Sequence, residues 1–336
     1  MPDSTRDFLL VTSILEQVNA SIASAVSAVE HPHQLLEDLA RRSILTTQVI
    51  GPGGWFKYHQ LFRRLLLIQL NATRSVAEIR ELHRAAAGWY AEHGDLEQAV
   101  SHSLSARDTQ SATNYLAELT PLLMLTGRSA TLLDLSQRVI DSVDEPTIVQ
   151  LVCKGEALHS LGDQPLELDR IIEHVAQELL KIEESDDDRT PTGVADPTSW
   201  ESPAALPWIR SVQLRRKGDA VGLAAMNRPE NVPSPSSAVE GEVAEGLIWL
   251  EQYREAERLL ELAMRRRTED GYVPHIVNNL GLLAASRAGQ GNIDDARSLT
   301  DAALDLCAKH GLGQVRHAMY ARLMSSWLAW SRRDLE

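Results

Sequence analysis

Two histidines and a run of three aspartates are the side chains best suited by type to hold a metal ion. His31 and His33 flank a proline, and an i, i+2 spacing brings two ligands together on an extended strand. Their surroundings instead predict a loop between two helices, with no Cys or Asp cluster nearby. The run Asp186–Asp188 precedes a proline-bearing segment, which is typical of a solvated linker. We therefore predict no metal site.

Motifs that carry catalysis or nucleotide binding are missing from the sequence. It contains no G-x-S-x-G elbow, no H-E-x-x-H and no G-x-x-x-x-G-K-[ST] phosphate loop. Acidic residues are abundant, but no spacing pairs them for acid–base work. We expect no catalytic residue and no enzyme. An enzyme on a helical scaffold stays open only if an acidic residue in a deep pocket has a strongly perturbed pKa.

Aromatic side chains in the second half are the candidates for binding a ligand or partner. Trp249 and Tyr253 are four positions apart, which predicts that they share one helical face. Stacked helix pairs curve into a superhelix whose concave face binds peptides or small ligands. The alternative is core packing, because large aromatic side chains commonly fill helix interfaces.

Charge and composition exclude several classes of protein. The 336 residues hold 33 Lys plus Arg against 47 Asp plus Glu, a net charge of −14 that is repelled by phosphate backbones and anionic membranes. No run approaches the ~18 apolar residues needed to cross a bilayer. Cys153 and Cys307 are too few for a disulfide framework and fit a reducing compartment. We predict a cytoplasmic protein without direct nucleic-acid or membrane binding.

The apolar pattern of residues 1–72 predicts a small winged-helix module. The β-branched segment Ile44–Ile50 is followed by a glycine-rich turn and then by the aromatic segment Trp55–Tyr58, which indicates a β-hairpin. Apolar residues at steps of three and four predict helices on both sides of this hairpin. Their ranges are Thr5–Leu15, Val18–Ala28, Gln34–Arg42 and His59–Leu70.

Small residues at fixed offsets predict tetratricopeptide-like helix pairs in the rest of the chain. Three sets share steps of twelve and then seven residues: Ala87, Ala99 and Ala106; Ala244, Ala256 and Ala263; Ala284, Ala296 and Ala303. Arg287 stands at the aromatic position of the third set, so that match is partial. We predict a first repeat region at 73–182, an acidic, proline-containing linker at 183–205, and further repeats at 206–336, with a short helix pair over 206–228.

Four segments resemble the large LuxR-type ATP-binding transcription regulators of the maltose-activator type, which are MalT-like STAND proteins. They are RDFLLVTSIL (6–15), LLEDLARRS (35–43), WFKYHQLFRRLL (55–66) and LHRAAAGWYAEHGDLEQAVSHSLSA (82–106). They occur in the family's order with similar gaps. The resemblance is specific over residues 6–106, and beyond them it is to tetratricopeptide-like superhelices in general.

The resemblance implies an upstream ATPase module and a terminal helix-turn-helix, and this sequence has a motif for neither. His59 stands at the first His of the family's "YHHLF" motif, with Gln60 where a second His is frequent. By resemblance, this histidine approaches the β-phosphate of ADP, so His59 would act only with an ATPase module supplied elsewhere. The alternative is a helix-start histidine packing beside Tyr58. We expect no cofactor in the chain itself, and ATP or ADP only through the missing module.

These observations together predict an all-α protein: a small winged-helix module followed by a tetratricopeptide-like superhelix. The function they favour is the non-catalytic, signal-sensing and protein-interaction portion, or a truncated relative, of a LuxR-family ATP-dependent transcription regulator. Its repeats would bind a small-molecule effector or a protein partner, and self-association is possible. The alternative is a stand-alone tetratricopeptide-like adaptor that recruits protein partners.

Overall fold

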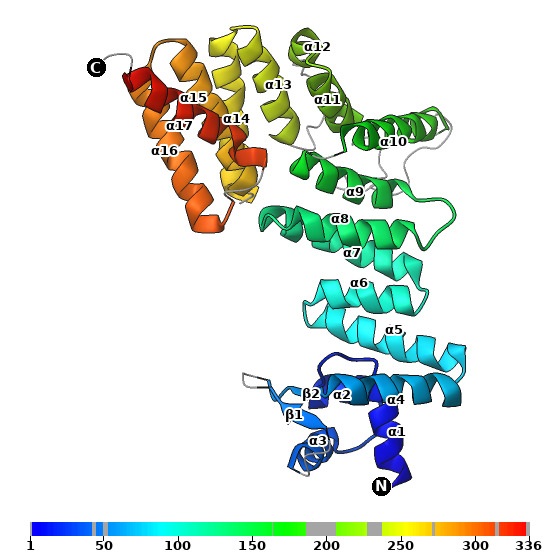
Figure 1. Cartoon of the computed structure of the whole chain (residues 1–336). Coiled ribbons are helices and arrows are strands. Elements are labelled where there is room, and N and C mark those ends of the chain that lie inside the picture. Colours follow the sequence, from blue (N-terminus) through cyan, green and yellow to red (C-terminus); the bar gives the residue numbers. More distant parts are fainter. Residues whose placement is uncertain are drawn as a thin grey trace. The chain divides into compact units, whose positions relative to one another are not determined.

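The computed structural model describes residues 2–41, 45–49, 53–162, 164–185, 206–226, 237–270, 273–312 and 316–333. The predicted all-α fold class is confirmed: helices dominate, and the strands described form one two-stranded sheet (Figure 1). The chain forms two compact units. The first comprises Met1–Leu119 with Arg138–Asp144, and the second comprises Thr120–Gln137 with Glu145–Glu336.

The N-terminal part of the first unit is a winged helix. Its elements are α1 (Asp3–Thr12), α2 (Ala20–Val26), α3 (Pro32–Arg41), β1 (Thr46–Gln48), β2 (Phe56–Tyr58) and α4 (Gln60–Thr73). The four expected helices are all present, with ends shifted by one to three residues. The expected hairpin is confirmed: β1 and β2 are antiparallel, with Thr46 opposite Tyr58 and Gln48 opposite Phe56. A bridge from Val18 to Phe56 adds a third extended segment beside β2.

One apolar core holds the winged helix together. Phe8, Leu9, Ile22, Leu36 and Phe56 come from three helices and the hairpin, and each is at most 1% exposed. Burying each of these side chains stabilises the folded module by roughly 1.5–3 kcal/mol. This gain is larger than the intrinsic helix or strand propensity of such short elements. The hairpin therefore owes its position to the core beneath it rather than to its own few hydrogen bonds.

Helix pairs follow the winged helix. The first four helices along the chain are α5 (Val76–Glu92), α6 (Leu96–Ser105), α7 (Thr109–Leu125) and α8 (Ser129–Ile140). The turn between α5 and α6 uses Gly94 at φ +78°, a left-handed conformation that favours glycine. Asp95 then caps α6 by accepting a hydrogen bond from the Gln98 amide at 3.2 Å.

The second unit is also helical, and it includes the end of α7 and most of α8. Further elements of this unit follow along the chain. They are α9 (Ile148–Leu161), α10 (Pro165–Ser185), α11 (Leu206–Arg216), α12 (Ala220–Ala225), α13 (Ser237–Trp249), α14 (Tyr253–Asp270), α15 (Val273–Gly289), α16 (Ile293–His310), the 3₁₀ helix η2 (Arg316–Ala318) and α17 (Met319–Arg333). Helices α11 and α12 are the short pair expected over 206–228. Most of the expected linker, with Asp186–Asp188, lies outside the described residues; its first three positions belong to α10.

The alanines that indicated repeats all lie in helix interfaces. The three sets fall on the pairs α5–α6, α13–α14 and α15–α16, and none of the nine alanines is more than 3% exposed. Larger side chains there would hold the paired helices apart. Arg287, the exception in the third set, forms an ion pair from its Nε to Glu257 Oε1 at 3.2 Å. Among the described helices, none is both long and apolar enough to cross a membrane.

Candidate effector site in the second unit

A pocket of about 590 Å³ in the second unit is lined by four arginines. Arg215 and Arg216 end α11, Arg316 begins η2, and Arg322 lies on the second turn of α17. Cations at a helix C-terminus are favoured by the helix dipole, which explains the first two locally. The fold, however, brings the other two to the same pocket from about a hundred positions further along the chain.

The remaining lining of this arginine pocket is apolar or neutral. Leu161, Met319 and Leu323 contribute apolar side chains that are exposed in the free protein. Ser326 and His159 add polar groups, and no described residue that lines the pocket is acidic. In a chain with a net charge of −14, the pocket is a local region of positive charge bordered by apolar surface.

Two buried carboxylates, Glu242 and Glu245, pair with arginines of this pocket. The Arg215 Nε lies 2.8 Å from Glu245 Oε2 and 3.2 Å from Glu242 Oε2, and both acids come from one face of α13. Arg316 Nη2 donates to Glu242 Oε1 at 3.2 Å. Burial raises the pKa of both Glu242 and Glu245, while Arg215 opposes that rise. These buried ion pairs connect α11 and η2 to α13.

A hydrogen-bonded chain leads from this ionic cluster to the surface. The Tyr320 hydroxyl donates to Glu245 Oε1 at 2.8 Å, and Trp249 Nε1 donates to the same hydroxyl at 3.1 Å. Burial, and then the charge of Glu245, raises the pKa of Tyr320, so its hydroxyl keeps its proton and remains a donor. Trp249 is 40% exposed and forms the outer end of the chain.

Three buried nitrogen atoms of pocket residues have neither a hydrogen bond nor an ion pair among the described residues: Arg215 Nη1, Arg316 Nε and His159 Nε2. Burial first, and then the charges of Arg215, His317 and Arg216, lower the pKa of His159 to about 3. The His159 imidazole is therefore neutral at pH 7. Buried polar atoms without partners are costly, at roughly 1–3 kcal/mol each, and these three belong to residues that line one pocket; the two on arginines are donors.

The structure overturns one expectation about the aromatic candidates. Trp249 is the last residue of α13 and Tyr253 is the first of α14, so the two do not share a helical face. Glu251 turns the chain between them at φ +60°. The Tyr253 ring packs against Gly289, where an added Cβ would lie 2.5 Å from Cζ of the ring. A ligand-binding role for both residues stays a prediction.

His59 occupies the N-cap position of α4, and its side chain is exposed and makes no capping hydrogen bond. Its backbone amide donates to the Leu45 carbonyl at 2.7 Å. A role for His59 toward a nucleotide stays a prediction.

His33 lies in the first turn of α3 rather than in a loop, with its Nδ1 3.8 Å from Glu37 Oε2. No group of three or more His, Cys, Asp or Glu side chains arranged for a metal is found within the described ranges.

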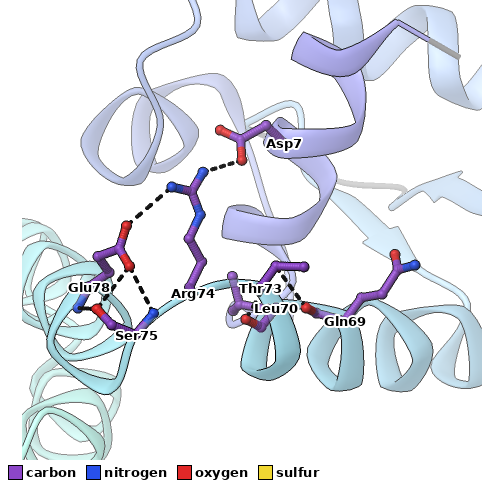
Figure 2. Close-up of polar contacts among 7 residues, drawn as sticks. All are labelled: Asp7, Gln69, Leu70, Thr73, Arg74, Ser75 and Glu78. Atoms are coloured by element: carbon purple, nitrogen blue, oxygen red, sulfur yellow. Dashed lines mark hydrogen bonds and ion pairs between the residues drawn. The ribbon is translucent and has the colours of Figure 1, made fainter.

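A polar junction connects the winged helix to the first repeat helix (Figure 2). Arg74, the C-cap residue of α4, forms ion pairs with Asp7 of α1 and, at 3.2 Å, with Glu78 of α5. Ser75 and Glu78 cap α5 reciprocally: the Ser75 amide donates to Glu78 Oε2 at 2.8 Å, and the Glu78 amide donates to Ser75 Oγ at 3.2 Å. The S-x-x-E spacing of Ser75 and Glu78 is a capping-box signal in the sequence, and none of the predicted sites included it.

Comparison with known proteins bears on both units. The family model of the MalT winged helix domain matches residues 1–78. Residues 1–78 form a MalT-type winged helix domain. The resemblance is thereby confirmed for the three segments at 6–15, 35–43 and 55–66, while the fourth, at 82–106, lies beyond the matched residues. The MalT-type domain includes α1 to α4 and ends inside α5, so the matched residues contain the whole junction of Asp7, Arg74, Ser75 and Glu78.

Some relatives with similar sequences are kinases, and the matched part is a small share of each kinase. Serine/threonine-protein kinases PknK from Mycobacterium tuberculosis and Mycobacterium bovis are 32% identical over 138 residues, which are 41% of this chain and 12% of each kinase. A solved structure resembles nearly the whole chain. It is the Signal Transduction ATPase with Numerous Domains (STAND) protein PH0952 from Pyrococcus horikoshii, with a tetratricopeptide repeat sensor.

The match to the STAND protein has a TM-score of 0.63 at 9% identity and covers 98% of this chain and 48% of that one. At this identity the likeness concerns the fold alone. It agrees with the expected combination of a winged helix and tetratricopeptide-like repeats. The chain thus spans about half the length of the STAND protein and a much smaller part of the kinases.

Proposed function

We propose that this chain is the non-catalytic, signal-sensing portion of a LuxR-family ATP-dependent transcription regulator that acts in the cytoplasm. Its second unit binds an effector in the arginine pocket, and its winged helix connects the repeats to an ATPase module. The observation that carries the proposal is the pocket itself: four arginines and three buried, unpartnered nitrogen atoms meet there in a chain with a MalT-type winged helix domain.

The proposed mechanism is a shift between two packings of the sensor helices. A ligand changes such an equilibrium only if it binds the two packings with different affinity. An acceptor in the pocket competes with Glu242 and Glu245 for Arg215, which holds α11 to α13. Binding therefore alters the contact between these helices, and this change is the signal that the rest of the regulator reads. ADP or ATP enters only through the ATPase module, with His59 facing the nucleotide.

A second candidate function is a stand-alone adaptor that recruits protein partners or a second copy of itself. The exposed indoles of Trp327 and Trp330 on α17 favour it, because exposed large aromatics are enriched at protein interfaces. Partner binding through Trp327 and Trp330 would require no ligand in the arginine pocket, although α17 also supplies Met319, Arg322, Leu323 and Ser326 to the lining of that pocket.

The reading frame and transcript around the coding region test the proposed function. A phosphate-loop module upstream or a helix-turn-helix downstream, in the same frame or a neighbouring one, supports a regulator. Unrelated flanking genes with a separate promoter would support the adaptor instead. A companion assay measures ATP turnover by the purified chain. Turnover that is abolished by substituting a residue of this chain contradicts the non-catalytic assignment.

A further inference from the structure

We infer that the effector held by the arginine pocket is a small molecule in which a phosphate group is joined to an apolar part. This inference rests on the proposed function and gives the chemical class of its ligand. It follows from four properties of the pocket: its charge, its unpartnered donors, its apolar border and its volume.

The charge of the pocket is not balanced by its own neighbours. Of the four arginines, Arg215 and Arg316 pair with Glu242 and Glu245, and Arg216 Nε pairs with Asp169 Oδ1 at 2.6 Å. Arg322 forms no ion pair with any described residue, and its side chain is exposed. Four guanidinium groups thus share three carboxyl groups, and burial favours the neutral form of two of these. An anion supplies the missing charge.

The donors in the pocket are of the chemical type that recognises phosphate. A guanidinium group is planar and presents forked N–H donors that match phosphate oxygens two at a time. Arg215 Nη1 and Arg316 Nε are buried and unpartnered within the part of the chain that the structure describes. A tetrahedral phosphate offers several acceptor oxygens in different directions, so it can meet donors that arrive from α11, η2 and α17 at once. A single carboxylate offers only one plane of acceptors.

The apolar border requires more than inorganic phosphate. Leu161, Met319 and Leu323 line the same pocket and are exposed in the free protein. Covering them removes apolar surface from water, which stabilises a complex by roughly 25 cal/mol per Å². A phosphate carried on a ring or an aliphatic group satisfies both halves of the pocket.

The volume sets the size of the ligand. About 590 Å³ falls within the roughly 300–1,000 Å³ of pockets that enclose small molecules. An acidic peptide would extend beyond a pocket of this size and would depend on residues outside it. This difference makes the peptide a distinguishable outcome of the test.

Isothermal titration calorimetry of the full chain with phenyl phosphate tests the inference, with phenol and inorganic phosphate at equal ionic strength as matched probes. Phenyl phosphate is expected to bind at least about tenfold more tightly than either. Arg322→Gln is expected to weaken it at least about tenfold without a change in melting temperature, because Arg322 is exposed and makes no ion pair with the described residues. Ser326→Asp, which adds a repelling charge, is expected to do the same.

Arg254→Gln is the matched control, since Arg254 is an exposed arginine of α14 that does not line the pocket. Its binding of phenyl phosphate is expected to equal that of the wild type. Three results would overturn the inference: equal binding of phenol and phenyl phosphate, unchanged binding in both pocket variants, or no binding of phenyl phosphate at millimolar concentration. Binding of hexaglutamate that depends on Arg322, without binding of phenyl phosphate, overturns it in favour of an acidic peptide.

The two proposals fail independently. Failure of phenyl phosphate to bind removes the ligand class, but the gene context still decides between regulator and adaptor. Conversely, unrelated flanking genes would exclude the assignment to a transcription regulator. Binding of phenyl phosphate that depends on Arg322 would still define an anion site in that case.

Discussion

The Trp249 indole donates a hydrogen bond of 3.1 Å to the hydroxyl of Tyr320, although the two residues lie 71 positions apart. The same hydroxyl donates to the buried Glu245 at 2.8 Å. One tyrosine oxygen therefore joins an exposed aromatic side chain of α13 to the ionic cluster behind the arginine pocket. A change at the buried Glu245 would therefore alter the surroundings of the exposed Trp249 indole through these two hydrogen bonds.

Tyr320→Phe is expected to destabilise the second unit by about 1–3 kcal/mol, because it leaves the buried Glu245 without its tyrosine donor. Urea unfolding followed by circular dichroism measures the change. Tyr253→Phe is the control: no hydrogen bond from its hydroxyl is found among the described residues, so a change below about 0.5 kcal/mol is expected. Equal effects of the two variants would show that the Tyr320 hydroxyl contributes nothing specific.

Gly289→Ala is expected to destabilise the second unit by about 1–3 kcal/mol. The added methyl group would lie 2.5 Å from the Tyr253 ring, so either the Tyr253 side chain must leave its position on Gly289 or α14 and α15 must move apart. Gly88→Ala provides the opposite case, since Gly88 lies in α5 with open space around the added methyl. Helix propensity predicts a gain of about 1 kcal/mol there. A neutral Gly289→Ala in the same unfolding assay would contradict the close approach of Tyr253.

Acid is expected to destabilise the first unit through His102. Its Nδ1 lies 2.9 Å from Nδ1 of His83, and burial, followed by the charges of His83 and Arg63, lowers the pKa of His102 to about 4. Between pH 6.5 and pH 4 the unfolded chain binds a proton that the folded chain resists. Stability is therefore full above pH 6.5 and falls as the pH drops, by about 2 kcal/mol at pH 5.

Urea unfolding of the wild type and of His102→Gln at pH 7.5 and pH 5 measures this dependence on pH. The variant is expected to lose less stability than the wild type between the two pH values. An identical loss in both proteins would exclude His102 as a source of the acid sensitivity.

Glu156→Gln is expected to stabilise the second unit at alkaline pH. Burial raises the pKa of Glu156 to about 7, so between pH 4.5 and pH 7 the unfolded chain releases a proton that the folded chain retains. The wild type loses up to about 3 kcal/mol over this window. The neutral amide of the variant avoids that loss. Melting temperatures at pH 5 and pH 8 check the sign, and a variant that is less stable at pH 8 would contradict it.

Ser75→Ala is expected to cost about 1 kcal/mol in the first unit, because it removes the side-chain acceptor at the start of α5. Asp7→Asn removes an exposed ion pair with Arg74, which contributes little in water. Hydrogen exchange of the α5 amides distinguishes the two: protection at the start of α5 falls in the first variant and stays unchanged in the second. Equal loss of protection would contradict the expectation, because it would show that the ion pair contributes as much to this junction as the cap does.

Local pattern alone determined most of the elements of this protein. The winged-helix hairpin followed from β-branched residues beside a glycine-rich turn, and the helix pairs followed from alanines at steps of twelve and seven. These signals are readable because strand and helix periodicity, turn residues and close helix packing each constrain residues that are near in the chain. The turn after Trp249 was not readable, since Glu251 adopts a left-handed conformation without glycine or proline to mark it.

Only the tertiary structure decided where the chain would bind a ligand. His159, Arg215, Arg316 and Arg322 belong to four separate elements, and each alone reads as an ordinary polar residue of a helix. Their meeting depends on how α9, α11, η2 and α17 pack, which is set by apolar contacts spread over more than 150 residues. The desolvation that leaves Arg215 Nη1 and His159 Nε2 without partners arises from the same packing, because a polar atom loses water only when other segments cover it.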